Sequence, residues 1–165
     1  MHGLGAFDPY PSMAFYLLAV STMEGPEMSV TISAVQYFYA NVKDRPGEAY
    51  GFLSTLSGSD VNLLAFNAVP LGWETTQLVL FPEDPGALVR AAAENGLVLS
   101  GPERAILVQG DDELGALVNV HRTLFEAGVN IFASNGVTDG HGRYGYLIYV
   151  RSGQFDQAVR ALDIE

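Results

Sequence analysis

An internal repeat constrains the fold of this 165-residue chain more than any single motif. When the sequence is set against itself with a shift of 68, residues 44–69 align with residues 112–137 without a gap, and Gly47 meets Gly115. Nine of the 26 aligned positions are identical, where unrelated sequences of ordinary composition would share about two. The identical residues are Asp44, Gly47, Thr55, Leu56, Val61, Asn62, Ala65, Asn67 and Val69 in the first copy and, in the same order, Asp112, Gly115, Thr123, Leu124, Val129, Asn130, Ala133, Asn135 and Val137 in the second. Such a repeat indicates a duplication, which decides the domain count before any motif is considered.

The two copies carry the same order of predicted elements. Short apolar, β-branched or aromatic runs at 34–42 and 104–110 are typical of strands. Apolar residues at helical spacing follow, and each helical run closes on a glycine, Gly58 or Gly128, suited to a left-handed C-cap. The predicted helices are the first helices at 46–58 and 114–128 and the second helices at 84–96 and 153–164. The remaining predicted strands are the second strands at 61–69 and 129–137 and the third strands at 74–81 and 143–150. A fourth strand is predicted at 97–100, in the first copy only.

This order predicts an α+β protein made of two tandem ferredoxin-like (βαββαβ) repeats, with antiparallel sheets that carry helices on one face. The bare face of such a sheet needs a cover, which we expect from the sister repeat or from another subunit. The predicted units are residues 28–102 and 103–165, after an N-terminal extension at 1–27.

The second predicted unit lacks its own last strand, so one sheet edge is expected to be open or shortened. Exposed edges are usually paired or protected. One hypothesis is that the apolar residues 14–20 form a strand that fills this edge or extends a sheet in a partner chain. The alternative is that the Gly- and Pro-containing extension is a disordered tail.

Charge and composition exclude several classes of function. The chain has 8 basic and 19 acidic residues and a net charge of -11, so neither nucleic acid nor an anionic membrane surface is an expected partner. It has no cysteine, which excludes disulfides, thiolate metal sites and cysteine nucleophiles. The apolar stretch 13–20 is shorter than the about 20 residues of a membrane helix and lacks the basic flank of a signal peptide. We therefore expect a cytoplasmic protein.

The turn between the first predicted strand and helix carries the step Asp-Arg-Pro-Gly at 44–47. One interpretation is punctuation, because proline at the first helical position loses no intrahelical hydrogen bond. The other is a binding site, because free amides at a helix start attract an anion. Gly47 and its counterpart Gly115 lack a Cβ, so the backbone there can approach a ligand closely.

On these residues, together with the Val-Asn pairs that begin the second strands, the chain from Met28 to Glu165 resembles the small stand-alone tandem ACT-domain proteins. The first copy matches the family's Asp-x-Pro-Gly step, whereas the second has Leu114 in place of the proline. The resemblance implies a non-catalytic regulatory module that binds a free amino acid at ACT–ACT interfaces and modulates a partner enzyme or its own assembly. It also implies a homodimer formed through ACT–ACT contacts.

In that family the ligand lies by the first strand-to-helix loop, against the start of the second strand of a facing unit. Carried over to this sequence, the implied ligand-binding residues are Asp44, Arg45, Pro46, Gly47 and Asn62 in the first copy, and Asp112, Leu114, Gly115 and Asn130 in the second. The chemistry agrees, since a helix start suits a carboxylate. Asp44 or Asp112 could pair with the ammonium group, and an asparagine amide both donates and accepts.

Two other functions stay open at this point. The chain could be a ligand-independent regulatory or interaction subunit of a metabolic enzyme, or an enzyme of the dimeric α+β barrel type, which shares the topology. No paired acid and base groups and no cofactor motif are found, so no catalytic residue, cofactor or metal is expected. Asp139 and His141 fall short of the three protein ligands usual in a zinc site and are interpreted as a hairpin turn.

Several conspicuous side chains are given structural interpretations. His121 is predicted to be a surface or boundary residue of a helix. Asn67 and Asn135 are interpreted as strand residues that face solvent or a partner. The aromatic run 37–39 and Trp73 are most simply core and interface residues.

Overall fold

The computed structural model describes residues 30–164, so the N-terminal extension and the predicted strand at 14–20 lie outside the described residues. In chain order the elements are β1 (Thr31–Lys43), α2 (Glu48–Gly58), β2 (Leu63–Pro70), β3 (Thr75–Pro82), α3 (Pro85–Asn95), β4 (Ser100–Asp111), α4 (Val118–Glu126), β5 (Ile131–Thr138), β6 (Arg143–Val150) and α5 (Ser152–Ala161). None of these helices is long and apolar enough to cross a membrane.

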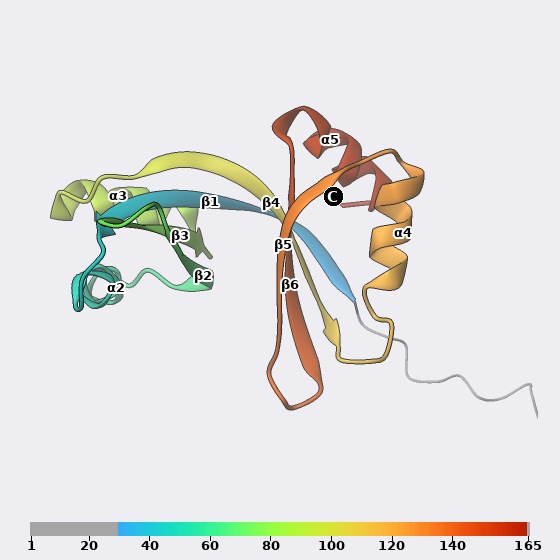
Figure 1. The fold of residues 1–165 in the computed structure, drawn as a ribbon, viewed down its shortest axis with the longest axis horizontal. Helices are drawn as coiled ribbons and strands as arrows, with labels where there is room; N and C mark the ends of the chain where they lie inside the picture. Colours follow the sequence, from blue (N-terminus) through green and yellow to red (C-terminus); the bar gives the residue numbers. More distant parts are fainter. Residues whose placement is uncertain (1–29, 165) are drawn as a thin grey trace, which may run out of the picture.

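The strands form one six-stranded antiparallel sheet in the order β2-β3-β1-β4-β6-β5. Figure 1 shows α2 and α3 at one end of the molecule and α4 and α5 at the other, with β1 and β4 running between the two ends. The α+β class is confirmed. The described strands form one sheet in place of a sheet for each predicted repeat, because the strands at the centre are long enough to belong to both halves.

The two halves share strands β1 and β4. β1 has 13 residues and pairs with β4 from Thr31 to Tyr39 and with β3 from Phe38 to Lys43. β4 pairs with β6 from Ile106 to Asp111. Of the strand predicted at 97–100, only Ser100 lies in a strand, and it belongs to β4 together with the strand predicted at 104–110. β1 pairs with β4 on both sides of the Gly-Pro step that separates the two predicted strands.

The first residues of β1 also occupy the sheet position that the second half was expected to leave vacant. Thr31 pairs with Gln109 and Gln36 with Arg104, which places this part of β1 beside β4 where a fourth strand would lie. The open edge predicted there is thus already paired. The predicted boundary between residues 102 and 103 falls inside β4, and the division into two domains stays a prediction.

Strand alternation separates two faces of the sheet. Even-numbered residues of β1, β3, β4 and β6 point toward the helices and form one core in each half, with Phe38 and Leu80 in the first and Ile106 and Ile148 in the second. Leu88 of α3 and Phe155 of α5 pack into these cores from the helices. Ile32, at the start of β1, packs against the core of the second half. The shared strand therefore contributes to both cores.

Odd-numbered residues of the central strands form a third cluster on the helix-free face. Its buried members are Tyr37, Val79, Phe81, Ala105, Leu107, Leu147 and Tyr149. Asn67 of β2 donates a hydrogen bond to the hydroxyl of Tyr149 in β6 (3.2 Å), so the two ends of the sheet approach each other over this cluster. The sister half thus covers part of the bare face, over the buried members of this cluster.

Equivalent turns in the two halves have equivalent hydrogen bonds. The amide of Asp44 donates to the carbonyl of Glu74 (2.9 Å), and the amide of Asp112, 68 residues later, donates to Gly142 (2.8 Å). The left-handed residue that follows the first helix of each half is not the same residue type. In the second half it is Gly128, with φ +69°, and at the equivalent position in the first half it is Asp60, with φ 56°. Gly58 is the last residue of α2 and not the predicted left-handed cap, because the turn comes two residues later.

Candidate functional site

A cavity of about 360 Å³ lies beside the turn from β4 to α4. Two of the predicted site residues, Asp112 and Gly115, line it. The other lining residues come from the rest of the turn and from the facing parts of β5 and β6: Glu113, Ala116, Leu117, Val118, Gly136, Val137, Thr138, Tyr144, Gly145 and Tyr146. The volume lies within the range of small-molecule sites, about 300–1,000 Å³.

The turn itself exposes the beginning of a helix. Gly115 has φ +84°, a conformation that glycine adopts without strain. α4 begins at Val118, and no side chain of the described residues caps it. In α3, by contrast, Asp84 accepts hydrogen bonds from the amides of Gly86 and Ala87 (2.8 and 3.1 Å). An uncapped helix start has amides and a dipole that favour a bound anion.

Two tyrosines that the sequence analysis did not single out form the wall of this cavity. Tyr144 and Tyr146 are buried neighbours on β6, and the hydroxyl of Tyr146 lies 2.9 Å from Nε2 of His121. Cross-strand glycines make room for both rings: a Cβ at Gly110 would lie 3.2 Å from the Tyr144 hydroxyl, and a Cβ at Gly136 only 2.8 Å from Cδ2 of Tyr146. The alternation in 143–150 predicts a strand, but tyrosine-over-glycine packing depends on a register that sequence alone does not reveal.

The Tyr144 hydroxyl is buried and has no hydrogen-bond partner within residues 30–164. Burial raises the pKa of Tyr144, and the charge of Asp111 adds to the effect. Asp111 itself forms an exposed ion pair with Arg143 (3.2 Å). The site therefore combines a neutral phenol wall, an acidic rim at 112–113 and an uncapped helix start.

In the first half, the turn at 44–47 is arranged differently. Gly47, with φ 96°, is the N-cap residue and α2 begins at Glu48, so Pro46 lies two residues before the helix and not at its first position as predicted. The Asp44 carboxylate accepts from Thr76 Oγ1 (3.2 Å), and Arg45 pairs with Glu48. These side chains are engaged within their own half.

Gly47 lines a second cavity of about 420 Å³, which is bordered by α2, the end of β1 and the segment after α3. Asp44, Arg45 and Pro46 are not part of its lining. In the second half, Leu114 is fully exposed and lies outside the 360 Å³ cavity.

Asn62 and Asn130 lie away from both turns. Asn62 precedes β2 and donates to the carboxylate of Glu83 (2.9 Å), at the far end of β3 from the 44–47 turn. The length of an eight-residue strand separates them, roughly 25 Å. The amide of Asn130 donates to Oε1 of Gln154 (3.3 Å) at the start of α5. Neither asparagine lines the cavity beside its own turn.

The segment 138–143 forms the hairpin turn predicted for it, between β5 and β6. Oδ1 of Asp139 accepts hydrogen bonds from the amides of His141 (2.7 Å) and Arg143 (3.0 Å). These two bonds lower the pKa of Asp139, and the bond from His141 has the larger effect. Among the described residues, no group of three or more metal-ligating side chains comes together.

Comparison of the sequence with protein-family models and with curated proteins gives no match. Solved structures do match. A protein from Bacteroides thetaiotaomicron has a TM-score of 0.67 at 16% identity, over 80% of this chain and 88% of that one. The aspartokinase alpha and beta subunits have a TM-score of 0.53 at 18% identity, over 81% of this chain and 94% of that one. The regulatory subunit of aspartate kinase from Thermus thermophilus, in its ligand-free form, has a TM-score of 0.51 at 16% identity, over 82% and 94%.

The chain has the fold of ACT-domain proteins. The resemblance stated from Asp-Arg-Pro-Gly and the Val-Asn pairs is thereby confirmed at the level of fold. Within this ACT-type fold, the cavity at 112–118 lies at a strand-to-helix turn, where the resemblance placed the ligand.

Proposed function

We propose that this chain is a non-catalytic regulatory module that binds a free amino acid at the turn between β4 and α4. Binding would modulate a partner enzyme or the chain's own assembly. The proposal treats the chain as two tandem ACT repeats, and the equivalent hydrogen bonds of Asp44 and Asp112 support that division.

The observation that carries the proposal is the cavity at 112–118, which joins the surfaces that an α-amino acid needs. The carboxylate would meet the uncapped start of α4. The ammonium group would pair with Asp112 or Glu113, with a charge-assisted hydrogen bond. The side chain would lie against Val137 and the two tyrosines of β6.

The structural neighbours support a regulatory role, since one of them is the regulatory subunit of an aspartate kinase. Asn62 and Asn130 stay predicted ligand residues, but each would reach a ligand at a turn only in contact with a second copy. We therefore include a homodimer in the proposal. The turn at Gly47 is the symmetry-related position, and it is the alternative to the turn at Gly115 for the ligand.

A thermal-shift screen against the twenty amino acids tests the proposal. A ligand bound only by the folded form stabilises it, by about 2.7 kcal/mol at a hundred times its Kd. Gly115→Val and Gly47→Val form a matched pair, because both glycines have positive φ and both substitutions strain a turn. We expect one or a few amino acids to raise the melting temperature of the wild type and of Gly47→Val but not of Gly115→Val.

The alternative function predicts a different result. If no amino acid stabilises the wild type, the ligand-binding proposal fails and the ligand-independent interaction subunit is favoured. If Gly47→Val alone abolishes the response, the ligand binds in the first half instead.

A further inference from the structure

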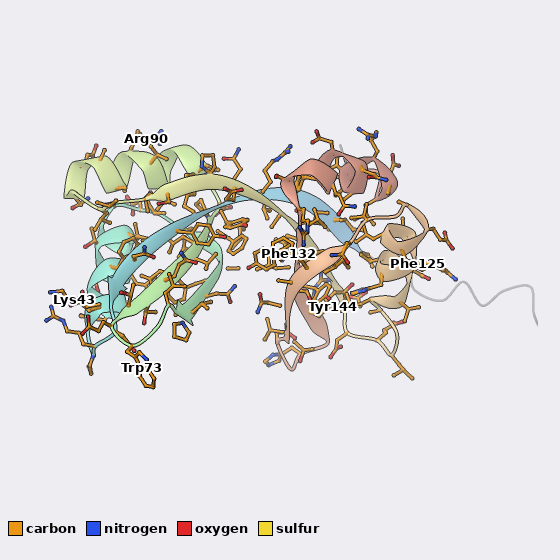
Figure 2. The ribbon with its side chains drawn as sticks, turned by 45° about the horizontal axis from the view of Figure 1, so that its top comes forward. Lys43, Trp73, Arg90, Phe125, Phe132 and Tyr144 are labelled. Carbon is orange, nitrogen blue, oxygen red and sulfur yellow. The ribbon has the colours of Figure 1, made fainter. Side chains whose placement is uncertain are left out.

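A cleft crosses the helix-free face between the edge strands β2 and β5. It consists of two adjoining cavities of about 310 and 440 Å³, and Asn67 of β2 and Asn135 of β5 line both of them. We call these two cavities the central cleft. Figure 2 shows Phe132, one of its lining residues, in the space between the two halves.

The two walls of the central cleft carry the same residues in the same order. Ala, Asn and Val occupy positions 65, 67 and 69 of β2 and positions 133, 135 and 137 of β5, and all six line the cleft. Val69 and Ala133 border the smaller cavity, whereas Ala65 and Val137 border the larger one. The strands therefore cross the cleft in opposite directions, with the two asparagines at the middle. Three of the nine identities between the copies lie here.

The lining contains no formal charge. Neither cavity is lined by an Asp, Glu, Lys, Arg or His residue, although the chain has 19 acidic and 8 basic residues. Burial raises the pKa of Tyr37 and Tyr149, so their hydroxyls stay protonated at neutral pH. An ion would find no counter-charge in the cleft, and burying an unpaired charge is costly.

The floor of the cleft offers hydrogen bonds and aromatic surface. The Tyr39 hydroxyl donates to that of Tyr37 (3.3 Å), and Asn67 Nδ2 donates to that of Tyr149 (3.2 Å). Tyr37 packs edge-to-face with Tyr39 and Tyr149, at centroid distances of 5.3 and 5.6 Å, so its neighbours already cover this ring. Phe132, 55% exposed, leaves its ring open to a ligand.

We propose that the central cleft is a binding site for an uncharged planar molecule whose polar edge both donates and accepts hydrogen bonds. The Asn135 amide, which can do both, would bind the polar edge, with Asn67 opposite. Phe132 would stack on the planar face. The combined cavities lie within the volume range of small-molecule sites. This site differs from the amino-acid site at Asp112–Val118, because it opens on the other face of the sheet. The two sites share only an edge, which is lined by Gly136, Val137, Gly145 and Tyr146.

Three probes of one shape test the charge requirement: benzamide, benzoate and benzamidinium, which are neutral, anionic and cationic. We expect benzamide to shift the side-chain amide signals of Asn67 and Asn135 in nitrogen-15 NMR spectra of the full chain. Benzoate and benzamidinium should bind at least several-fold more weakly. The signal of Asn119, which is exposed on α4 and bonded to Arg122, serves as an internal reference that should not move.

Substitutions give a second readout. Asn135 and Phe132 are exposed enough for the chain to keep its fold without them. We expect Asn135→Leu and Phe132→Ala each to weaken benzamide binding several-fold, and Asn119→Leu to leave it unchanged.

The proposal fails if benzamide moves neither cleft amide up to its solubility limit, or if Asn135→Leu binds as the wild type does. Tighter binding of benzamidinium would also overturn it, because the aromatic walls would then select a cation.

Discussion

Gly136 of β5 and Tyr146 of β6 are cross-strand partners, and the ring of Tyr146 occupies the space that a side chain at 136 would need. A Cβ at Gly136 would lie 2.8 Å from Cδ2 of the ring. Tyr146 lines the 360 Å³ cavity on one face of the sheet and the larger part of the central cleft on the other. The position of this ring thus affects both candidate sites.

Gly136→Ala should therefore force Tyr146 to move and should cost about 1–3 kcal/mol of unfolding free energy, the usual range for overpacking. The movement should also break the contact between Tyr146 and His121. Urea denaturation measures the loss. The matched control is Gly145→Ala on β6, where a Cβ would meet nothing within 4 Å. Equal stability of the two variants would show that the ring relaxes without cost.

Gly47→Ala should destabilise the protein through backbone strain alone. Its φ of 96° is unfavourable for alanine, yet a Cβ there would meet nothing within 4 Å. We expect a loss of about 1–2 kcal/mol. Gly51→Ala, in the same turn-and-helix segment and also without a neighbour, should instead stabilise α2 by about 0.5–1 kcal/mol. Thermal denaturation of both variants separates the effect of backbone strain from that of packing. A shift of the melting temperature in the same direction in both variants would contradict the assignment of strain to Gly47.

Ile32→Ala tests whether the start of β1 belongs to the second half. Ile32 pairs with Val108 and packs against the second core, although it lies at the start of the first half in sequence. Its partly buried side chain should contribute about 1–3 kcal/mol. We expect Ile32→Ala to unfold in one cooperative transition, with its midpoint at a lower urea concentration than that of the wild type. Amide hydrogen exchange in β6 should be faster than in the wild type. Val98→Ala, at an 82% exposed position, should change stability by less than about 0.5 kcal/mol. Unchanged exchange in β6 would contradict the contribution of Ile32 to the second core.

Asp139→Asn should reduce stability in a pH-dependent way. Backbone hydrogen bonds from His141 and Arg143 lower the pKa of Asp139 below its ordinary value of 3.8. A lowered folded-state pKa means that the stabilisation is fully present above that ordinary value and is lost as the pH falls through the folded-state pKa. Urea denaturation at about pH 7 and about pH 2 should show a difference between wild type and variant that shrinks in acid. A difference that does not change with pH would show that these bonds do not depend on the charge.

Most of the elements could be predicted because each carries a local signal. The alternation in 143–150 and the Asp-Pro-Gly start of α3 are examples: β6 has the predicted bounds, and Asp84 caps α3. The strand sharing could not be predicted in this way. Gly101-Pro102 reads as a break between two strands, yet β1 pairs across it, and pairing between distant segments leaves no local pattern.

The candidate site was predicted in part. Gly115 could be found from the repeat, because a left-handed turn needs glycine and the same step recurs at Gly47. Tyr144 and Tyr146 were not found, since their place depends on glycines in neighbouring strands. Asn67 and Asn135 could be recognised as a repeated pair and interpreted as strand residues that face solvent or a partner. That the two asparagines line the same cleft depends on the curvature of the whole sheet.

The pairing of Thr31–Tyr39 with Ser100–Gln109 also determines how the molecule would respond to a pulling force. β1 and β4 run between the two halves (Figure 1), so a force that draws the halves apart acts along the strands. The cross-strand hydrogen bonds would then be loaded in shear, all together, and would not open one after another as in a zipper. We therefore expect the two halves to behave mechanically as one body, and tension applied across the molecule should unravel the outer hairpins before it breaks the centre.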